Sequence, residues 1–222
     1  MRDLRNLWII PLWAYFVTDT ADSPPWDRAG PRPDWQSLRH HVAFENPWIR
    51  VESHDTVAPT GHPASYGVVR YANRAIGVIP LHDDGTVSLV GQQRFPLGRY
   101  SWEIPEGGAP LDEDPLDGAR RELREETGLT AAEWRPILHM DLSNSVSDEA
   151  CILYLATGLS QADCAPDATE AFDHARVAFS HLLKAVIIGQ VRDSLTVAGV
   201  LRLHHMTTSG ELPAALSAAI TR

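Results

Sequence analysis

Hydrophobic and polar residues alternate in the first strands that the sequence predicts. Residues 48–52 read Trp-Ile-Arg-Val-Glu, which predicts a half-buried strand with Arg50 and Glu52 on one face. Residues 66–71 follow a turn at residues 59–61 and are predicted to be the hairpin partner of this strand. The chain is therefore expected to enter its folded part through an antiparallel hairpin.

Further apolar runs of strand length follow. Residues 75–81 and 86–92 predict a second hairpin, because the intervening residues 82–85 (His-Asp-Asp-Gly) are of the types that form turns. Residues 134–142 and 150–157 predict two more strands, joined by a polar loop. Short strands thus lie on both sides of the middle of the chain.

One short helix is predicted between these strands, and both of its ends are marked. Asp114 is a suitable N-cap, Pro115 fits the first helical position, and Gly128 supplies the left-handed residue that ends a helix. The apolar residues of this helix are spaced three and four apart and form one stripe, which we expect to face a core: Leu116, Ala119 and Leu123.

Two further helices are predicted at residues 180–189 and 193–205. Together with strands before and after one short helix, they indicate an α+β fold. At 222 residues the chain is long for one typical domain and short for two. The expected division is an N-terminal extension over residues 1–43, N-terminal strands over 44–74, a main domain over 75–207 and a C-terminal tail over 208–222.

The N-terminal extension begins like a signal peptide, because Arg2 and Arg5 precede the apolar residues 7–17. This run is too short to span a bilayer, which takes about 20 apolar residues. Pro11 interrupts it, and no small-residue cleavage site follows. We therefore expect a packed arm or strand and no membrane association, ahead of a translation-start artefact or export, with an irregular linker over residues 18–41.

Charge and cysteine content narrow the classes of function. A net charge of -10 argues against nonspecific binding of nucleic acid. An anionic substrate would then have to be met by local arginines and a metal ion. Cys151 lies in an apolar run and Cys164 in a polar loop, so we expect no disulfide framework and a reducing, cytoplasmic location.

A second face of the predicted central helix is acidic. Glu122 lies three and four residues from Glu125 and Glu126, where like charges repel by about 0.2–0.5 kcal/mol per pair. A hard divalent cation would relieve this repulsion, and Mg²⁺ suits carboxylates better than zinc does. Arg121 can also pair with Glu125 at i, i+4. Taken alone, three glutamates would more often be a solvated surface.

The spacing of the whole stretch reverses that interpretation. Residues 107–129 satisfy the pattern G-x5-E-x7-R-E-U-x-E-E-x-G-U, where U is a bulky aliphatic residue, at all nine defined positions. The stretch resembles the Nudix box of the Nudix hydrolases, and a match of this length is highly specific. The matching residues are Gly107, Glu113, Arg121, Glu122, Leu123, Glu125, Glu126, Gly128 and Leu129.

The resemblance implies a Nudix fold, in which a mixed β-sheet lies between helices. It also implies hydrolysis of a nucleoside diphosphate linked to another group, with Mg²⁺ or Mn²⁺ as the cofactor. The implied roles are metal binding by Glu122 and Glu126, a shared metal or ordered water at Glu125, a backbone carbonyl ligand from Glu106, and orientation of the catalytic Arg121 by Glu113.

Several features resemble the ADP-ribose pyrophosphatase branch of this family, over about residues 44–205. Residues 102–108 (Trp-Glu-Ile-Pro-Glu-Gly-Gly) are close to the branch's E-[LIV]-P-A-G sequence, and Arg94 stands where the branch places an arginine against substrate phosphates. The resemblance implies cleavage of ADP-ribose to AMP and ribose 5-phosphate, with Trp102 or Phe95 beside the adenine. By residue type alone, Arg94 could equally be a surface cation.

The loop before residue 150 matches the branch in part. Residues 145–149 match the end of its P-G-x-S-x-E motif, which makes Glu149 a candidate substrate-binding residue. Asn144 and Ser145, however, stand where Pro-Gly is usual. Because that proline marks a preference for ADP-ribose, another nucleoside diphosphate sugar or a dinucleotide cofactor stays open as the substrate. A noncatalytic nucleotide-binding module ranks below both, since the box is complete.

Two further roles follow from the branch. Residues 48–52 resemble the N-terminal strand that these enzymes exchange within a homodimer, so Arg50 and Glu52 are expected to contact the substrate of the neighbouring subunit. The branch also supplies a general base from a loop about forty residues beyond the box. Glu170 matches that base best among the acids of residues 163–174, each of which could also be a solvated loop residue.

Overall fold

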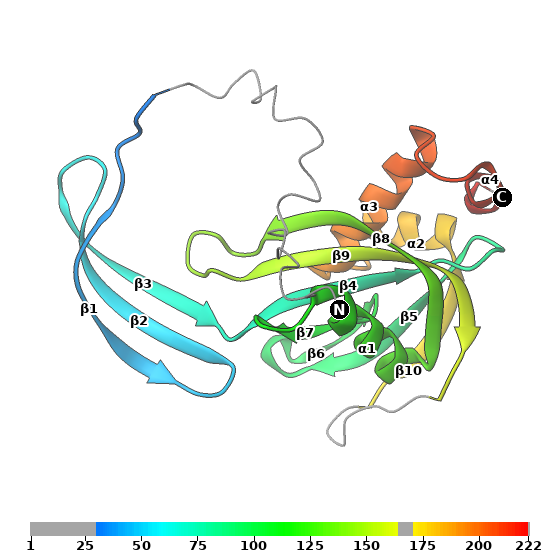
Figure 1. Cartoon of the computed structure of the whole chain (residues 1–222), viewed down its shortest axis with the longest axis horizontal. Coiled ribbons are helices and arrows are strands. Elements are labelled where there is room, and N and C mark those ends of the chain that lie inside the picture. Colours follow the sequence, from blue (N-terminus) through cyan, green and yellow to red (C-terminus); the bar gives the residue numbers. More distant parts are fainter. Residues whose placement is uncertain (1–29, 164–170, 222) are drawn as a thin grey trace, which may run out of the picture.

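The structure is a computed structural model that describes residues 30–163 and 171–221. Its strands form three sheets (Figure 1). The N-terminal sheet consists of β1 (Gln36–Glu45), β2 (Ile49–Val57) and β3 (Pro63–Tyr71), and a second sheet consists of β10 (Asp173–Ala178), β5 (Thr86–Arg94) and β6 (Arg99–Glu103). The third sheet has four strands, which are β7 (Glu106–Pro110), β4 (Asn73–Pro80), β9 (Ala150–Gln161) and β8 (Leu129–Asp141). The helices are α1 (Pro115–Thr127), α2 (Phe179–Ile187), α3 (Ser194–Thr208) and α4 (Ala214–Ile220).

The four-stranded sheet is mixed and has helices on both faces. Its order is β7-β4-β9-β8, and β4 and β9 are parallel while the other neighbours are antiparallel. In β4, Ile76 and Val78 pack with α1, whereas Ile79 packs with α2 and α3 on the opposite face. Both faces of the central strands are therefore buried, which explains their near-continuous apolar runs. The predicted α+β fold with a mixed sheet between helices is confirmed.

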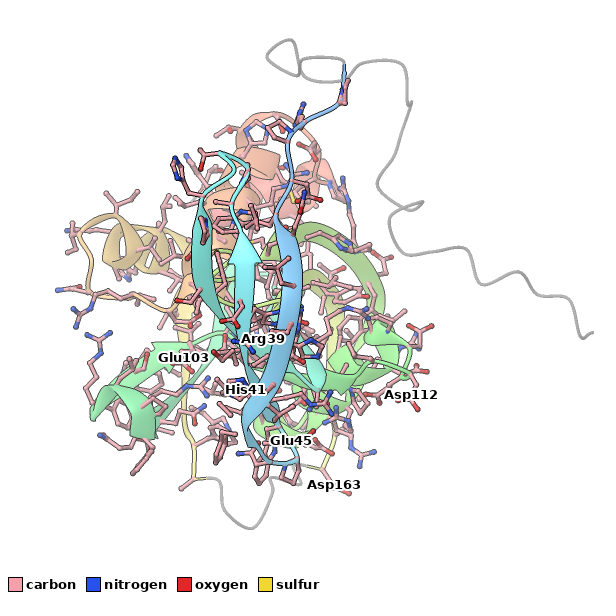
Figure 2. The ribbon with its side chains drawn as sticks, turned by 90° about the vertical axis from the view of Figure 1, so that its left-hand side faces the viewer. Arg39, His41, Glu45, Glu103, Asp112 and Asp163 are labelled. Atoms are coloured by element: carbon pink, nitrogen blue, oxygen red, sulfur yellow. The ribbon has the colours of Figure 1, made fainter. Side chains whose placement is uncertain are left out.

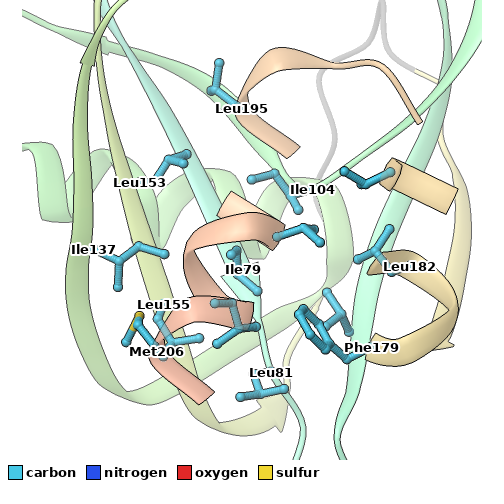
Figure 3. Close-up of a cluster of buried hydrophobic side chains, with 14 of the residues drawn as sticks. Ile79, Leu81, Ile104, Ile137, Leu153, Leu155, Phe179, Leu182, Leu195 and Met206 are labelled. Atoms are coloured by element: carbon cyan, nitrogen blue, oxygen red, sulfur yellow. The ribbon is translucent and has the colours of Figure 1, made fainter. Parts of the chain in front are cut away.

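The larger core lies between this sheet, the sheet of β5, and helices α2 and α3. Figure 3 shows Ile79, Leu153 and Leu155 of the mixed sheet facing Leu182 of α2 and Met206 of α3. Burying one such side chain stabilises a fold by about 1.5–3 kcal/mol. A Cβ at position 199 would lie 2.9 Å from Cδ1 of Ile79, so glycine there lets α3 approach the sheet closely.

The N-terminal sheet stands beside the main domain, at the left of Figure 1, and faces the viewer in Figure 2. β2 and β3 form the predicted antiparallel pair. The prediction of an irregular linker over residues 18–41 is wrong for residues 36–41, which belong to β1. Every side chain of β1 is exposed, so main-chain bonding to β2, rather than burial of an apolar face, defines the strand.

The second predicted hairpin is wrong, although its turn exists. His82 and Gly85 close the turn through main-chain hydrogen bonds, and an isolated bridge joins Leu81, just after β4, to Val87 of β5. β4 and β5 themselves belong to different sheets. Both edges of β4 are occupied by β7 and β9. β5 pairs with β6 and β10 instead.

The C-terminal tail expected over residues 208–222 contains a helix. α4 packs against the turn at Gly85, where an added Cβ would lie 2.3 Å from the carbonyl oxygen of Ala219. Leu212 and Ile220 are buried in the larger core, so this segment completes the domain. No helix of the described residues is long and apolar enough to cross a membrane. The predictions for residues 7–17, Cys164 and Glu170 lie outside the described residues.

Candidate active site

The central helix, α1, has the ends that its sequence predicts. The carboxylate of Asp114 accepts a hydrogen bond from the Leu116 N–H at 2.9 Å, and Gly128 has a left-handed φ of 66°. Ala119 and Leu123 are fully buried against the mixed sheet. Anchoring this stripe turns the face that carries Glu122 and Glu126 towards the edge strand β7.

A glycine at the start of β7 makes room for the first of these carboxylates. A Cβ on Gly107 would lie 2.2 Å from the carboxyl carbon of Glu122, so the buried Glu122 side chain fits only against a residue without one. The carboxylate of Glu126, which is 2% exposed, accepts a hydrogen bond from the Glu106 N–H at 3.0 Å. The structure therefore brings Glu122, Glu126 and the main chain of Glu106 together.

Arg121 holds the acidic residues in place. It donates to Glu122 at 2.7 Å and to Glu125 at 3.1 Å, and it also contacts Glu113 at 3.4 Å. The expected contacts with Glu125 and Glu113 are thus present. Burial by itself would lower the pKa of Arg121, but the charge and hydrogen bond of Glu122 hold it above its ordinary value. Arg121 thus offsets part of the repulsion between the carboxylates.

A pocket of about 640 Å³ lies beside β7. Two predicted substrate residues, Arg94 and Glu149, line it, together with the main chain at Gly107. Burial raises the pKa of Glu149. Trp48 and Asp193 also line the pocket, although the sequence analysis did not select them. The sequence did offer weak signals for both, since Trp48 opens the first predicted strand and Asp193 opens a predicted helix.

Arg94 is held by two carboxylates of this pocket. It donates to Glu103 from Nε at 2.9 Å and from Nη2 at 2.6 Å, and its Nη2 also donates to Glu106. Burial raises the pKa of Glu106 well above its ordinary value, and the charge of Asp193 adds to this effect. The guanidinium of Arg94 is therefore paired with Glu103 and Glu106 through Nε and Nη2. Its Nη1 is left to donate to a ligand.

Two sets of oxygen ligands in the described residues suit a hard cation. Glu103, Glu106 and Asp193 have carboxylate oxygens within 4.8 Å of one another, with Arg94 between two of them. The glutamates of α1 are not part of such a close group in the described chain. Glu122 and Glu126 still fit Mg²⁺, because two buried carboxylates beside the main chain of Glu106 offer the oxygen ligands that a hard cation takes.

Several predicted residues lie away from the pocket. Phe95 is 95% exposed, and Trp102 packs edge-on against Tyr100 at 5.8 Å, so neither lines it. Arg50 pairs with Glu45 at 2.5 Å, and Glu52 accepts hydrogen bonds from His54 and Arg70, all within the N-terminal sheet.

Arg50 and Glu52 therefore do not reach the pocket of their own chain, and their predicted contact with a neighbouring subunit's substrate stays a prediction. A smaller pocket of about 320 Å³ between β8 and α4 contains no residue of the motif.

Comparison with known proteins finds similar chains over the segment that carries the site. A model of the NUDIX domain matches residues 72–190. An ADP-ribose pyrophosphatase of Mycobacterium tuberculosis is 34% identical over 63% of this chain and 69% of its own length. One from Bacillus subtilis is 32% identical over 56% and 67%. The crystal structure of an ADP compounds hydrolase superposes with a TM-score of 0.74 at 17% identity, over 83% of this chain and 100% of the other, and supports the fold alone.

Proposed function

Because this chain belongs to the NUDIX family, we propose that it hydrolyses the pyrophosphate bond of ADP-ribose and releases AMP and ribose 5-phosphate. It is a pyrophosphohydrolase of the ADP-ribose pyrophosphatase branch; the substrate and the metal are the proposed parts. The strongest support for the substrate and the metal is that Glu122, Glu126 and the main chain of Glu106 lie together beside a pocket of about 640 Å³.

The proposed mechanism assigns each group one task. Glu122, Glu126 and the carbonyl of Glu106 would hold Mg²⁺ or Mn²⁺, which when bound neutralises diphosphate charge and lowers the pKa of a water. Arg121 fixes Glu122 and Glu125 through hydrogen bonds of 2.7 and 3.1 Å. We propose Glu170 as the base that takes the proton of the attacking water.

Arg94 completes the proposed site from the other side of the pocket. Its Nε and Nη2 are occupied by Glu103 and Glu106, so the orientation of its guanidinium is fixed before a substrate arrives. The remaining Nη1 would donate to the phosphates. Trp48, which lines the same pocket, is a better candidate for contact with the adenine than Trp102 or Phe95.

A second candidate substrate class is another nucleoside diphosphate sugar or a dinucleotide cofactor. Asn144 and Ser145 favour it, because they replace the Pro-Gly usual in the branch. In this loop the N–H groups of Val146 and Ser147 both donate to the carbonyl of Ser143, which has a φ of 47°. Leu142, Ser143 and Glu149 line the pocket, so a change in this loop would alter the space for the substrate.

We also propose that the chain acts as a homodimer in the cytoplasm. Large apolar side chains on β1 face outward, with Leu38 66% and Phe44 53% exposed, which a second copy would cover. Cys151 is a buried free thiol, and burial raises its pKa to about 12, which suits an unreactive thiol in a reducing compartment.

The test measures AMP release with Mg²⁺ from ADP-ribose, ADP-glucose, NADH, FAD and a diadenosine polyphosphate. We expect ADP-ribose to lead at least tenfold in kcat/KM, which is about 1.4 kcal/mol of transition-state discrimination. Another leading compound would support the second class of substrate.

Glu126→Gln is the control, because its amide oxygen can still accept from the Glu106 N–H while the charge is lost. The variant should fold normally and lose orders of magnitude in rate. Full turnover by this variant would contradict the metal-site assignment.

A further inference from the structure

A histidine outside the motif contacts the main chain of a motif residue. Nε2 of His174 lies 2.6 Å from the carbonyl oxygen of Glu126. A carbonyl can only accept, so Nε2 carries the proton and donates it. His174 belongs to β10, in the sheet of β5 and β6, whereas α1 packs on the mixed sheet. This hydrogen bond therefore links the two layers at the C-terminal end of the catalytic helix.

The end of α1 needs such a partner. The last four carbonyls of a helix have no N–H to accept from within the helix. The Gly128 N–H donates to the carbonyl of Arg124, and the Thr127 hydroxyl donates to that of Leu123. The carbonyl of Glu126 instead accepts a hydrogen bond from the imidazole of His174. A histidine at this end also interacts favourably with the helix dipole.

In the part of the chain that the structure describes, Glu126 is held through both its side chain and its main chain. Its carboxylate accepts from the Glu106 N–H of β7 at 3.0 Å, and its carbonyl accepts from His174 of β10 at 2.6 Å. These contacts fix both the side chain and the main chain of a proposed metal ligand. Without the second contact, the last turn of α1, which also carries Glu125, could shift.

The strand that carries His174 is itself anchored. His174 pairs with Val90 of β5, and the neighbouring Asp173 accepts a hydrogen bond from the hydroxyl of Tyr100 at 2.5 Å. This hydrogen bond raises the pKa of Tyr100 to about 12. The imidazole thus projects from a paired strand, which gives it a defined position relative to α1.

We propose that His174 is a positioning residue for the metal-binding carboxylates of α1 and acts through the carbonyl of Glu126. The inference rests on the proposed function, because it takes Glu126 as a metal ligand. Removing the partner of a metal ligand typically weakens metal binding or activity by about 10- to 100-fold. We expect a loss in that range when the histidine donor is removed.

The test compares His174→Ala, His174→Gln and His204→Ala in the full chain. Glutamine retains an N–H donor at a similar reach, and His204 is an exposed histidine of α3 that serves as the matched control. Mn²⁺ affinity is measured by calorimetry, and kcat and KM are measured with ADP-ribose. His174→Ala should bind Mn²⁺ at least about tenfold more weakly and lose kcat with little change in KM. His174→Gln should recover most of both, and His204→Ala should match the wild type.

Equal Mn²⁺ affinity of His174→Ala and the wild type would overturn the proposal, as would equal impairment of the alanine and glutamine variants. Should His174→Ala not fold, His174→Asn, whose amide is one carbon shorter, replaces it in the same comparison. A wild-type protein that binds Mn²⁺ but does not cleave ADP-ribose would contradict only the proposed substrate. A wild-type protein that binds no Mn²⁺ would contradict both proposals.

Discussion

Gly107 sets the distance between β7 and the helix that carries the acidic residues. The carboxylate oxygens of Glu122 lie 2.3 and 2.4 Å from where a Cβ on residue 107 would be. Elsewhere between α1 and β7, a Cβ on Gly118 would lie 2.7 Å from Cβ of Ala109. Both glycines permit a close approach of α1 to β7. Gly107 faces the carboxylate of Glu122, which we assign to metal binding, whereas Gly118 lies nearest to Ala109.

Gly107→Ala should therefore impair metal binding more than folding. The atoms displaced belong to the end of a flexible side chain, so Glu122 can move aside while the backbone stays in place. We expect Mn²⁺ affinity to fall by about 10- to 100-fold, measured by calorimetry, with a far-ultraviolet circular dichroism spectrum like that of the wild type. Gly67→Ala, at a position with open space, is the control. Unchanged Mn²⁺ affinity would show that the Glu122 carboxylate does not need this space.

Among the elements, α3 is tied to the mixed sheet by a network around Glu211. Arg202 of α3 donates to its carboxylate at 2.9 and 2.7 Å, and Arg135 of β8 contacts it at 3.3 Å. Arg135 also donates to the main-chain carbonyl of Glu211 at 2.9 Å. The hydrogen bonds from Arg202 and Ser209 lower the pKa of Glu211 to about 2. The network thus joins the helices to the face of the sheet opposite α1.

The contribution of Glu211 to stability should depend on pH. Its pKa is lower in the folded chain than its ordinary value of 4.5, so it stabilises the fold above that value and loses this effect as the pH falls towards about 2. Glu211→Gln should unfold at lower urea concentration than the wild type at neutral pH. The difference should shrink between about pH 4.5 and pH 2. A constant difference across that range would contradict the role of the charge.

In the molecule as a whole, the loop that carries the partial branch motif also joins the N-terminal sheet to the main domain. The Val69 N–H of β3 donates to the carbonyl of Val146 at 2.8 Å, and the hydroxyl of Tyr66 donates to that of Ser145 at 2.5 Å. Asp148 accepts from the Tyr71 N–H at 3.0 Å. The position of the sheet is therefore coupled to the loop that lines the pocket.

The exposed apolar residues of β1 lead to a prediction about assembly. We expect the wild type to sediment as a dimer and Phe44→Glu or Leu38→Glu to sediment largely as a monomer, because a charge on that face would have to be buried between the copies. Leu111→Glu, at an equally exposed apolar position of the main domain, should leave the dimer intact. Analytical ultracentrifugation distinguishes these results. A monomeric wild type would contradict the proposed interface.

The sequence alone determined α1 and both of its ends. Asp114, Gly128 and the apolar stripe mark the helix through interactions that span at most a few residues, so spacing is sufficient to predict them. The contacts of Arg121 with Glu125 and Glu113 were also predicted, because all three residues are positions of the motif. The α+β class also followed from the order of the apolar runs.

Only the tertiary structure decided the partners of the strands and the residues that line the pocket. β4 pairs with β9, whose residues lie some seventy positions further along, rather than with the adjacent β5. β1 is defined by main-chain hydrogen bonds to β2, and none of its side chains is buried in the chain. Trp48, Asp193 and His174 reach the site from segments far from the motif. Such contacts depend on how distant segments are folded together, and no local pattern of residue types records that arrangement.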